Sequence, residues 1–325
     1  VQGTGQGHIS RARAMARAFS AHPDVKITWL FSGRDRDRFF DMEVFGHYLW
    51  RSGLSFSTGG GKLSKVDTLL NNKFVRFASD VRSLDVSDYD LVVSDFEPVT
   101  AWAARFAGKK SVGIGHQYAF GRGTPRDGDS WASDLIMRKF APVDVSVGLH
   151  WLPYHDCIAP PILDLPIQPV TRDPYTLVYL PFEDQPFITD LLMRFPRYHF
   201  VQYAPGLSPG SSGNVRRFPA SVQGFKRHLL RAGGVICNSG FELISECLQL
   251  NKPVLTKPLE GQFEQLSNAR ALRDAGFATT SPVLDEAVLA RWLESPRSPG
   301  GQSYPDVAAA LAAWLAGGRL EGVEA

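Results

Sequence analysis

The polar turn Asn238-Ser239-Gly240 lies between two segments that could position it for chemistry. An apolar run, 234–237, precedes the turn, and residues 241–250 after it show the apolar spacing of a helix. Such a strand–turn–helix unit presents free backbone N–H groups and the positive end of a helix dipole, which favour a bound phosphate. Glu246, one to two turns into the predicted helix, could then reach a ribose diol. The turn therefore indicates a nucleotide site.

The sequence continues this unit with a predicted strand over 252–256 and a predicted helix over 261–272. Ligands of open parallel sheets bind at the carboxyl ends of the strands. Glu264 and Gln265 follow the second strand, where their polar side chains could hold whatever is attached to the phosphates.

Glycines and a histidine at the start of the chain form a second candidate site. Gly3, Gly5 and Gly7 precede His8, and a helix is predicted over 9–19. Glycines let a ligand approach the backbone, and an unperturbed histidine titrates at about pH 6.5, which suits proton transfer at neutral pH. The third glycine comes one residue early for the dinucleotide fingerprint G-x-G-x-x-G, and the strand predicted over 25–31 ends without a ribose-binding acid. A nicotinamide or flavin cofactor is therefore not expected, and a purely structural turn is the alternative.

Two further predicted strands end in polar residues. The strand over 90–94 is followed by Asp95 and Glu97, and the strand after it by His116 and Gln117. The carboxyl ends of neighbouring parallel strands are where chemistry is expected in such sheets. The alternative for Asp95 is that it only caps the helix that follows.

The C-terminal pattern resembles the donor-nucleotide signature of GT-B glycosyltransferases, which use nucleoside-diphosphate sugars. The matching residues are Asn238, Gly240, Glu246, Pro258, Glu264-Gln265 and Asn268-Ala269. The region is also similar to the lipid-linked N-acetylglucosaminyltransferase of peptidoglycan synthesis. The block over 90–117 is similar to an uncharacterised bacterial and archaeal subgroup of this fold. The glycine loop, with Arg11 three residues after its histidine, resembles the loop between the two domains of these enzymes.

Two residues depart from the family pattern. Asn238 stands where many relatives have His or Arg, so a charged phosphate contact is missing. Glu242 stands where relatives carry Asn or an apolar residue. An acid so close to a pyrophosphate would repel it unless the side chain points away.

The resemblance implies an α/β chain with two Rossmann-like, doubly wound domains that face each other across a cleft. Residues 1–168 would form the acceptor-side domain, with a first strand that we expect to be truncated. Residues 173–304 would form the donor nucleotide-binding domain. The segment 305–325, with a helix predicted over 307–315, would pack back on the first domain.

The resemblance also implies an inverting, metal-independent transfer of a sugar from a nucleoside-diphosphate sugar, usually a uridine one, to an acceptor hydroxyl. The acceptor would be a glycan, a lipid or a small molecule. His8 would be the base and Asp95 would hold its other ring nitrogen, although His8 could instead only shape the loop or bind the acceptor. The alternatives are a nucleotide-sugar 2-epimerase of the same fold and a nucleotide-sugar-binding protein without catalysis.

The site residues that the resemblance implies fall into three groups. The catalytic candidates are His8, Asp95 and Glu97. The donor-binding candidates are Asn238, Ser239, Gly240, Phe241, Glu246, Glu264 and Gln265. The acceptor-side candidates are Arg11, His116 and Gln117.

Composition limits the partners and the compartment. The 325 residues are 44% hydrophobic and 21% charged, which suits two globular domains, and a net charge of +2 gives no general attraction for nucleic acid. The three cysteines form no C-x-x-C pair, so neither a zinc site nor a disulfide framework is expected. There is no apolar run of about 18 residues and no visible signal peptide. We therefore expect a cytoplasmic protein with no cofactor, no metal and no transmembrane segment, and peripheral contact with the inner face of the membrane stays open.

Overall fold

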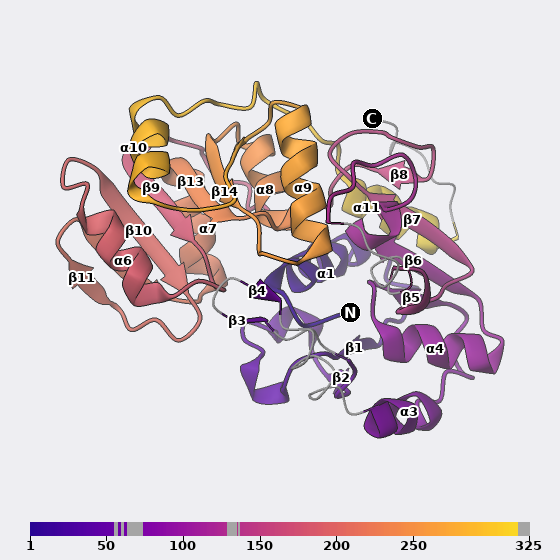
Figure 1. The fold of residues 1–325 in the computed structure, drawn as a ribbon. Coiled ribbons are helices and arrows are strands. Elements are labelled where there is room, and N and C mark those ends of the chain that lie inside the picture. Colours follow the sequence, from indigo (N-terminus) through magenta and orange to yellow (C-terminus); the bar gives the residue numbers. More distant parts are fainter. Residues whose placement is uncertain (55–57, 60–61, 64–73, 129–134, 136, 318–325) are drawn as a thin grey trace.

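The chain forms two α/β units, which Figure 1 shows in indigo to magenta and in pink to orange. The computed structural model describes residues 1–325 except 55–57, 60–61, 64–73, 129–134, 136 and 318–325. Within the described ranges, no helix is long and apolar enough to cross a membrane.

The first unit contains two short parallel sheets that the start of the chain links. One sheet pairs β1 (Trp29–Phe31) with β2 (Tyr48–Trp50). The other has the order β5 (Val92–Ser94), β6 (Ser111–Gly115), β7 (Val145–Leu149), β8 (Ile158–Ala159). Gln2 lies between the two sheets, because it forms a parallel bridge with Ser32 after β1 and donates its backbone N–H to the Asp95 carbonyl after β5. The glycine loop therefore starts beside the carboxyl ends of β1 and β5.

Helices cover these sheets. They are α1 (Gln6–Phe19), α3 (Phe74–Ser83) and α4 (Pro98–Ala107), with 3-10 turns at η1 (Arg36–Arg38), η2 (Glu43–Phe45) and η3 (His116–Ala119). A small antiparallel pair, β3 (Thr58–Gly59) and β4 (Lys62–Leu63), lies outside both sheets. The strand expected over 25–31 forms only at 29–31, and residues 25–28 before it line a cavity of about 740 Å³.

The second unit is one sheet of seven strands in the order β11-β12-β10-β9-β13-β14-β15, parallel except for β11. The strands are β9 (Asp173–Tyr179), β10 (His199–Ala204), β11 (Gly210–Ser212), β12 (Val215–Pro219), β13 (Ala232–Asn238), β14 (Val254–Lys257) and β15 (Thr279–Thr280). The helices are α6 (Gln185–Met193), α7 (Val222–Arg231), α8 (Phe241–Gln249), α9 (Phe263–Asp274) and α10 (Glu286–Glu294). β9 and β13 are central and buried on both faces, which explains their nearly continuous apolar runs.

The last described helix, α11 (Val307–Leu315), returns to the first unit and packs on α1. Leu311 and Ala312 are buried in the same apolar cluster as Ala14 and Met15 of α1. The cluster continues into the second unit, so the two units share part of one core. The expected α/β fold with parallel sheets is confirmed.

Candidate active site

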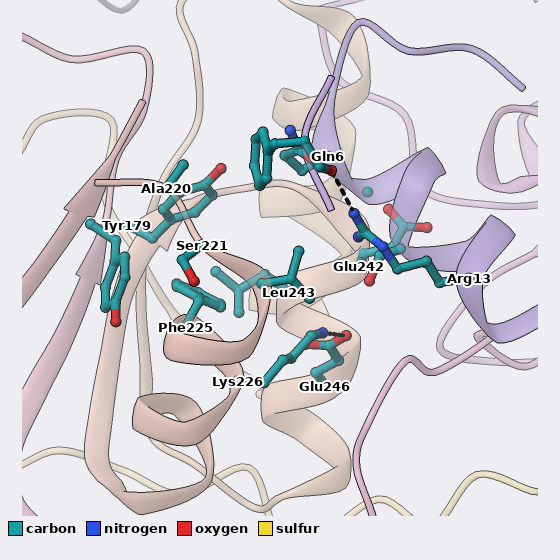
Figure 2. Close-up of a pocket in the computed structure, with 15 residues that line it drawn as sticks. Gln6, Arg13, Tyr179, Ala220, Ser221, Phe225, Lys226, Glu242, Leu243 and Glu246 are labelled. Atoms are coloured by element: carbon teal, nitrogen blue, oxygen red, sulfur yellow. Dashed lines mark hydrogen bonds and ion pairs between the residues drawn. The ribbon is translucent and has the colours of Figure 1, made fainter. Parts of the chain in front are cut away.

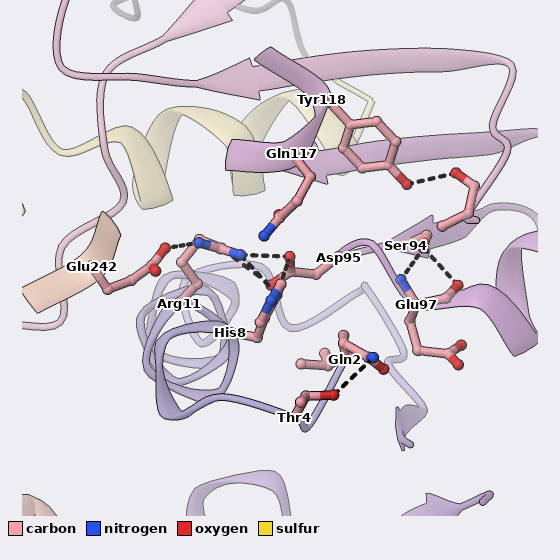
Figure 3. Close-up of polar contacts among 12 residues, drawn as sticks. Gln2, Thr4, His8, Arg11, Ser94, Asp95, Glu97, Gln117, Tyr118 and Glu242 are labelled. Carbon is pink, nitrogen blue, oxygen red and sulfur yellow. Dashed lines mark hydrogen bonds and ion pairs between the residues drawn. The ribbon is translucent and has the colours of Figure 1, made fainter. Parts of the chain in front are cut away.

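His8 and Asp95 come together at the glycine loop (Figure 3). α1 starts just before His8, with Gly5 as an extended N-cap that provides no side-chain cap. His8 Nδ1 lies 2.9 Å from Asp95 Oδ1, at the point where β5 has ended. Gly3 is needed for this approach, because a Cβ there would come within 2.6 Å of the Ser32 carbonyl oxygen. The loop and the strand end thus place a histidine against a carboxylate.

Arg11 holds Asp95 from the same helix as His8. Its Nη2 donates to Asp95 Oδ1 at 2.7 Å and its Nε to Oδ2 at 3.1 Å. Burial alone would raise the pKa of Asp95, but the charge of Arg11 and the contact with His8 outweigh burial and hold that pKa well below its usual range. Arg11 Nη2 also lies 2.9 Å from His8 Nδ1, but it donates to Asp95 Oδ1. We assign the His8 proton to Nδ1, so that both groups donate to the ionised carboxylate, and this leaves Nε2 able to accept a proton.

Glu97 does not share the role expected from the sequence. Its carboxylate is fully buried and caps α4, accepting the backbone N–H groups of Val99 at 2.8 Å and Thr100 at 2.7 Å. It also accepts the hydroxyls of Thr100 and Ser32. A carboxylate with four donors has no room for a substrate proton, so this geometry corrects the catalytic expectation for Glu97. It also overturns the alternative that Asp95 is the helix cap.

Phe96 separates the two acids by a strained turn. Its φ of 48° is in the left-handed region, which a bulky side chain rarely adopts. The ring is buried against Phe140 and Tyr118, at centroid distances of 5.1 and 5.7 Å. This packing stabilises a backbone turn that sends Asp95 toward His8 and Glu97 into the helix cap.

A cavity of about 110 Å³ lies between α1 and the second unit (Figure 2). Glu246 of α8 faces it and pairs with Lys226 of α7. Burial raises the pKa of Glu246 to about 7, and the charge of Lys226 opposes this rise. The second unit contributes mainly aromatic and polar side chains, Tyr179, Tyr203, Ser221, Phe225, Lys226, Glu242, Leu243 and Glu246. The first unit contributes Gln6, Gly7, Ser10, Arg13 and Phe40.

In the sequence, Lys226 lies in a segment rich in basic residues over 226–231. In the structure that residue reaches a buried acid. β12 connects to β13 and β13 to β14 in the same direction across the sheet, so right-handed connections place α7 and α8 on one face. This topology is the signal that could have paired Lys226 with Glu246.

The turn after β13 is polar, and one of its buried polar atoms has no hydrogen-bond partner among the described residues. The Asn238 side-chain N–H₂ donates to Glu183 and to the Lys257 carbonyl, both at 3.1 Å, which fixes its orientation. Asn238 Oδ1 is buried and has no partner among the described residues. Lys257 Nζ lies 2.8 Å from Glu183, so a positive charge stands beside Asn238 although none stands on it. Gly240 caps α8 in an extended conformation without a side-chain bond.

The expected acceptor-side residues His116 and Gln117 meet the donor side instead. His116 is fully buried, stacks on Phe241 with 4.0 Å between ring centroids, and lies 2.7 Å from Asn268 Oδ1. Gln117 donates to Glu264 at 2.9 Å. Phe241 therefore packs in the interface, and Glu264 receives a neighbour from the first unit.

Gln265 and Ser239 also take internal partners. Gln265 Oε1 accepts the backbone N–H of Leu259 at 3.0 Å, and its side chain is buried. Ser239 bonds with Thr256 through their hydroxyls at 2.9 Å. Both residues hold the loops around the donor turn in place.

Glu242, in the first turn of α8, pairs with Arg11 across the two units, so a neighbouring guanidinium balances its charge. Among the described residues, no three His, Cys, Asp or Glu side chains gather as metal ligands do. The cysteines are free, with Cys157 exposed and Cys237 and Cys247 buried.

Two facing Rossmann-like units with a polar turn, a glycine loop and a histidine–carboxylate pair between them define a GT-B protein. The family model described as glycosyl transferase family 1 matches residues 1–296. The chain belongs to this family and is a glycosyltransferase, as the sequence motifs predict.

Solved structures agree with this fold. MurG of Acinetobacter baumannii has a TM-score of 0.58 at 13% identity and covers 96% of this chain and 97% of its own. The glycosyltransferase SnogD of Streptomyces nogalater has a TM-score of 0.54 at 16% identity and covers 97% of each chain. MnaA of S. aureus, in a structure with UDP, has a TM-score of 0.58 at 11% identity and covers 97% of this chain and 95% of its own. A search of curated proteins finds no match.

Proposed function

We propose that this glycosyltransferase moves a sugar from a uridine-diphosphate sugar to an acceptor hydroxyl, with inversion and without a metal. The observation that carries the proposal is the pair formed by His8 and Asp95, 2.9 Å apart at the glycine loop. The UDP in the structure of MnaA, a protein of similar fold, supports the choice of nucleotide.

In this proposal His8 removes the proton of the acceptor hydroxyl as the oxygen attacks the anomeric carbon. The C–O bond to the acceptor forms on the face opposite the breaking bond to the diphosphate, so the configuration inverts. Asp95, held ionised by Arg11, stabilises the imidazolium that results. The proton ends on His8 and the bonding electrons leave with the diphosphate.

The leaving diphosphate gains charge and needs donors that are already in place. The N-terminus of α8, capped only by Gly240, supplies backbone N–H groups and a helix dipole. Lys257 beside Asn238 is the nearest substitute for the cation that many relatives carry at the turn. Preorganised donors of this kind stabilise developing charge strongly in a site from which water is excluded.

Sugar and ribose hydroxyls require acceptors, and two buried side chains provide such atoms. Asn238 Oδ1 and Gln117 Oε1 are buried without a partner in the described part of the chain. Buried acceptors left unpaired are costly, so a ligand rich in hydroxyl donors suits them. Glu246 is assigned to the ribose, where it would exchange Lys226 for the two hydroxyl groups.

The test is a mass-spectrometric screen of nucleotide sugars incubated with the protein, with and without acceptor extracts. A glycosyltransferase releases the nucleoside diphosphate faster when its acceptor is present, and His8→Ala should abolish that release. An epimerase converts the nucleotide sugar into an isomer of the same mass, which chromatography before the mass measurement separates, and a binding protein retains the nucleotide sugar unchanged. Either of these outcomes would overturn the proposal.

A further inference from the structure

Glu242, the acid that departs from the family pattern, is joined to the catalytic pair through Arg11 (Figure 3). Arg11 Nη1 pairs with the Glu242 carboxylate, while the other guanidinium nitrogens hold Asp95. The side chains of Arg11, Asp95 and Glu242 are only 3, 13 and 15% exposed. Together with His8, these three side chains form one row, in the order Glu242, Arg11, Asp95 and His8, that water barely reaches.

The row spans both units. His8 and Arg11 are on α1 and Asp95 follows β5, whereas Glu242 is in the first turn of α8 in the donor domain. Gly7 allows the crossing, because a Cβ at that position would overlap the Glu242 carboxylate. The contact between Glu242 and Arg11 therefore depends on the packing of α8 against the first turn of α1.

Charge counting shows what Glu242 adds. The carboxylates of Asp95 and Glu242 contribute two negative charges and Arg11 one positive charge, so the row has a net charge of −1 while His8 is neutral. A proton on His8 brings the row to zero. Without the Glu242 charge, the same proton would leave a net +1 in a poorly solvated place, which is unfavourable.

We propose that Glu242 is a positioning residue that acts through Arg11 to strengthen His8 as a base. The second carboxylate on Arg11 lets His8 hold a proton more readily. Base strength is then coupled to the contact between the two domains, because Glu242 lies on α8 and Arg11 on α1. The inference rests on the proposed function for the use of this proton, but the coupling itself can be measured without a substrate.

The other charged groups near His8 stay unchanged in the test. Arg11 lies on the same helix as His8, and Asp95 follows β5. Glu264 of α9 accepts a hydrogen bond from Gln117. A change seen after neutralising Glu242 alone therefore reports the charge of Glu242.

The experiment follows the imidazole signals of ¹⁵N-histidine-labelled protein by NMR against pH, with His8 assigned by its loss in His8→Gln. Glu242→Gln should shift the titration midpoint of His8 down by about 0.5–1 pH unit, because one nearby charge is removed. The matched control Glu286→Gln removes an exposed carboxylate of α10 and should leave the midpoint within about 0.2 unit. A midpoint in Glu242→Gln that equals the wild-type value would overturn the proposal.

A second pair of variants separates charge from packing. Glu242→Asp and Glu242→Asn are equally shortened and differ only in charge, so the proposal requires a lower midpoint in the Asn variant than in the Asp variant. Equal midpoints would assign the effect to packing and refute the coupling. If wild-type protein turns over no nucleotide sugar, the proposed function fails, while these titrations still decide whether Glu242 acts on His8.

Discussion

On the first-domain side of the site, Asp95 accepts from both His8 and Arg11, so the carboxylate is already positioned by its own domain. On the donor side, Glu246 is paired with Lys226, and Asn238 Oδ1 has no partner among the described residues. The Asp95 carboxylate thus takes its hydrogen bonds from its own domain, whereas the donor side must exchange or gain partners when a nucleotide binds. The side that would carry out the chemistry is therefore already arranged, whereas the side that would bind the nucleotide has to rearrange. Mutations on the base side should accordingly change kcat, and mutations on the donor side should change affinity.

The largest expected effect is on the base side. His8→Ala should lower kcat by about 10²–10⁴-fold, because the acceptor hydroxyl loses its general base. Donor affinity should stay nearly unchanged, since in the proposed binding mode the nucleotide lies mainly on the second domain. Steady-state kinetics with calorimetry of UDP binding checks both parts. A variant that keeps most of its turnover would move the base assignment away from His8.

A change on the donor side should act on affinity instead. Glu246→Ala should weaken UDP binding by about tenfold to a hundredfold, because charge-assisted hydrogen bonds to the ribose are worth roughly 1.5–3 kcal/mol. Calorimetry with UDP measures the loss, and the deoxyribose analogue should lose less between wild type and variant. Equal affinity of both proteins for UDP would show that Glu246 does not hold the ribose.

The pH dependence of binding sharpens the same contrast. The pKa of Glu246 is raised to about 7, so the carboxylate gains its charge as pH rises through neutrality. Between pH 6 and 8 its ionised fraction rises by about tenfold, and UDP affinity should rise by up to that factor. Glu246→Gln should lose this part of the pH dependence but keep the part due to the phosphate.

The same shift affects folding. Because the folded protein binds the Glu246 proton more tightly than the unfolded chain, this group's contribution to stability falls as pH rises from its ordinary pKa, about 4.5, to about 7. Thermal unfolding of wild type and Glu246→Gln across that range should show the difference. A pH profile that is identical in the two proteins would contradict the raised pKa.

Local patterns predicted much of the fold. Apolar spacing gave α8 and α11 nearly to the residue, and the strand–turn–helix around Asn238 is where the motif requires it. The strand expected over 25–31 was too long, because its first residues have no paired neighbour in the described part of the chain. Pairing depends on residues distant in sequence, which a local pattern does not contain.

In the site, too, the sequence predicted local features but not the contacts between residues distant in the chain. The residue types around His8 and Asp95 were identified, but the roles of Asp95 and Glu97 follow from the left-handed turn at Phe96, which the sequence does not reveal. The direction of Glu242 depends on Arg11, far away in the chain. Contacts between the two domains, such as His116 on Phe241, also lie beyond a single sequence without its fold.

The smallest expected effect concerns Gln265, which the family pattern assigns to the sugar. In the structure its amide oxygen accepts the buried N–H of Leu259, so Gln265→Ala should lower the free energy of unfolding by about 1 kcal/mol and leave that donor unpaired. Affinity for UDP and for the UDP-sugar should then fall little and equally, because the loop before α9 is loosened for both ligands. Thermal unfolding and calorimetry with the two ligands measure these quantities. A selective loss for the UDP-sugar at unchanged stability would instead place Gln265 on the sugar, and it would show that the donor side also exchanges the Leu259 contact on binding.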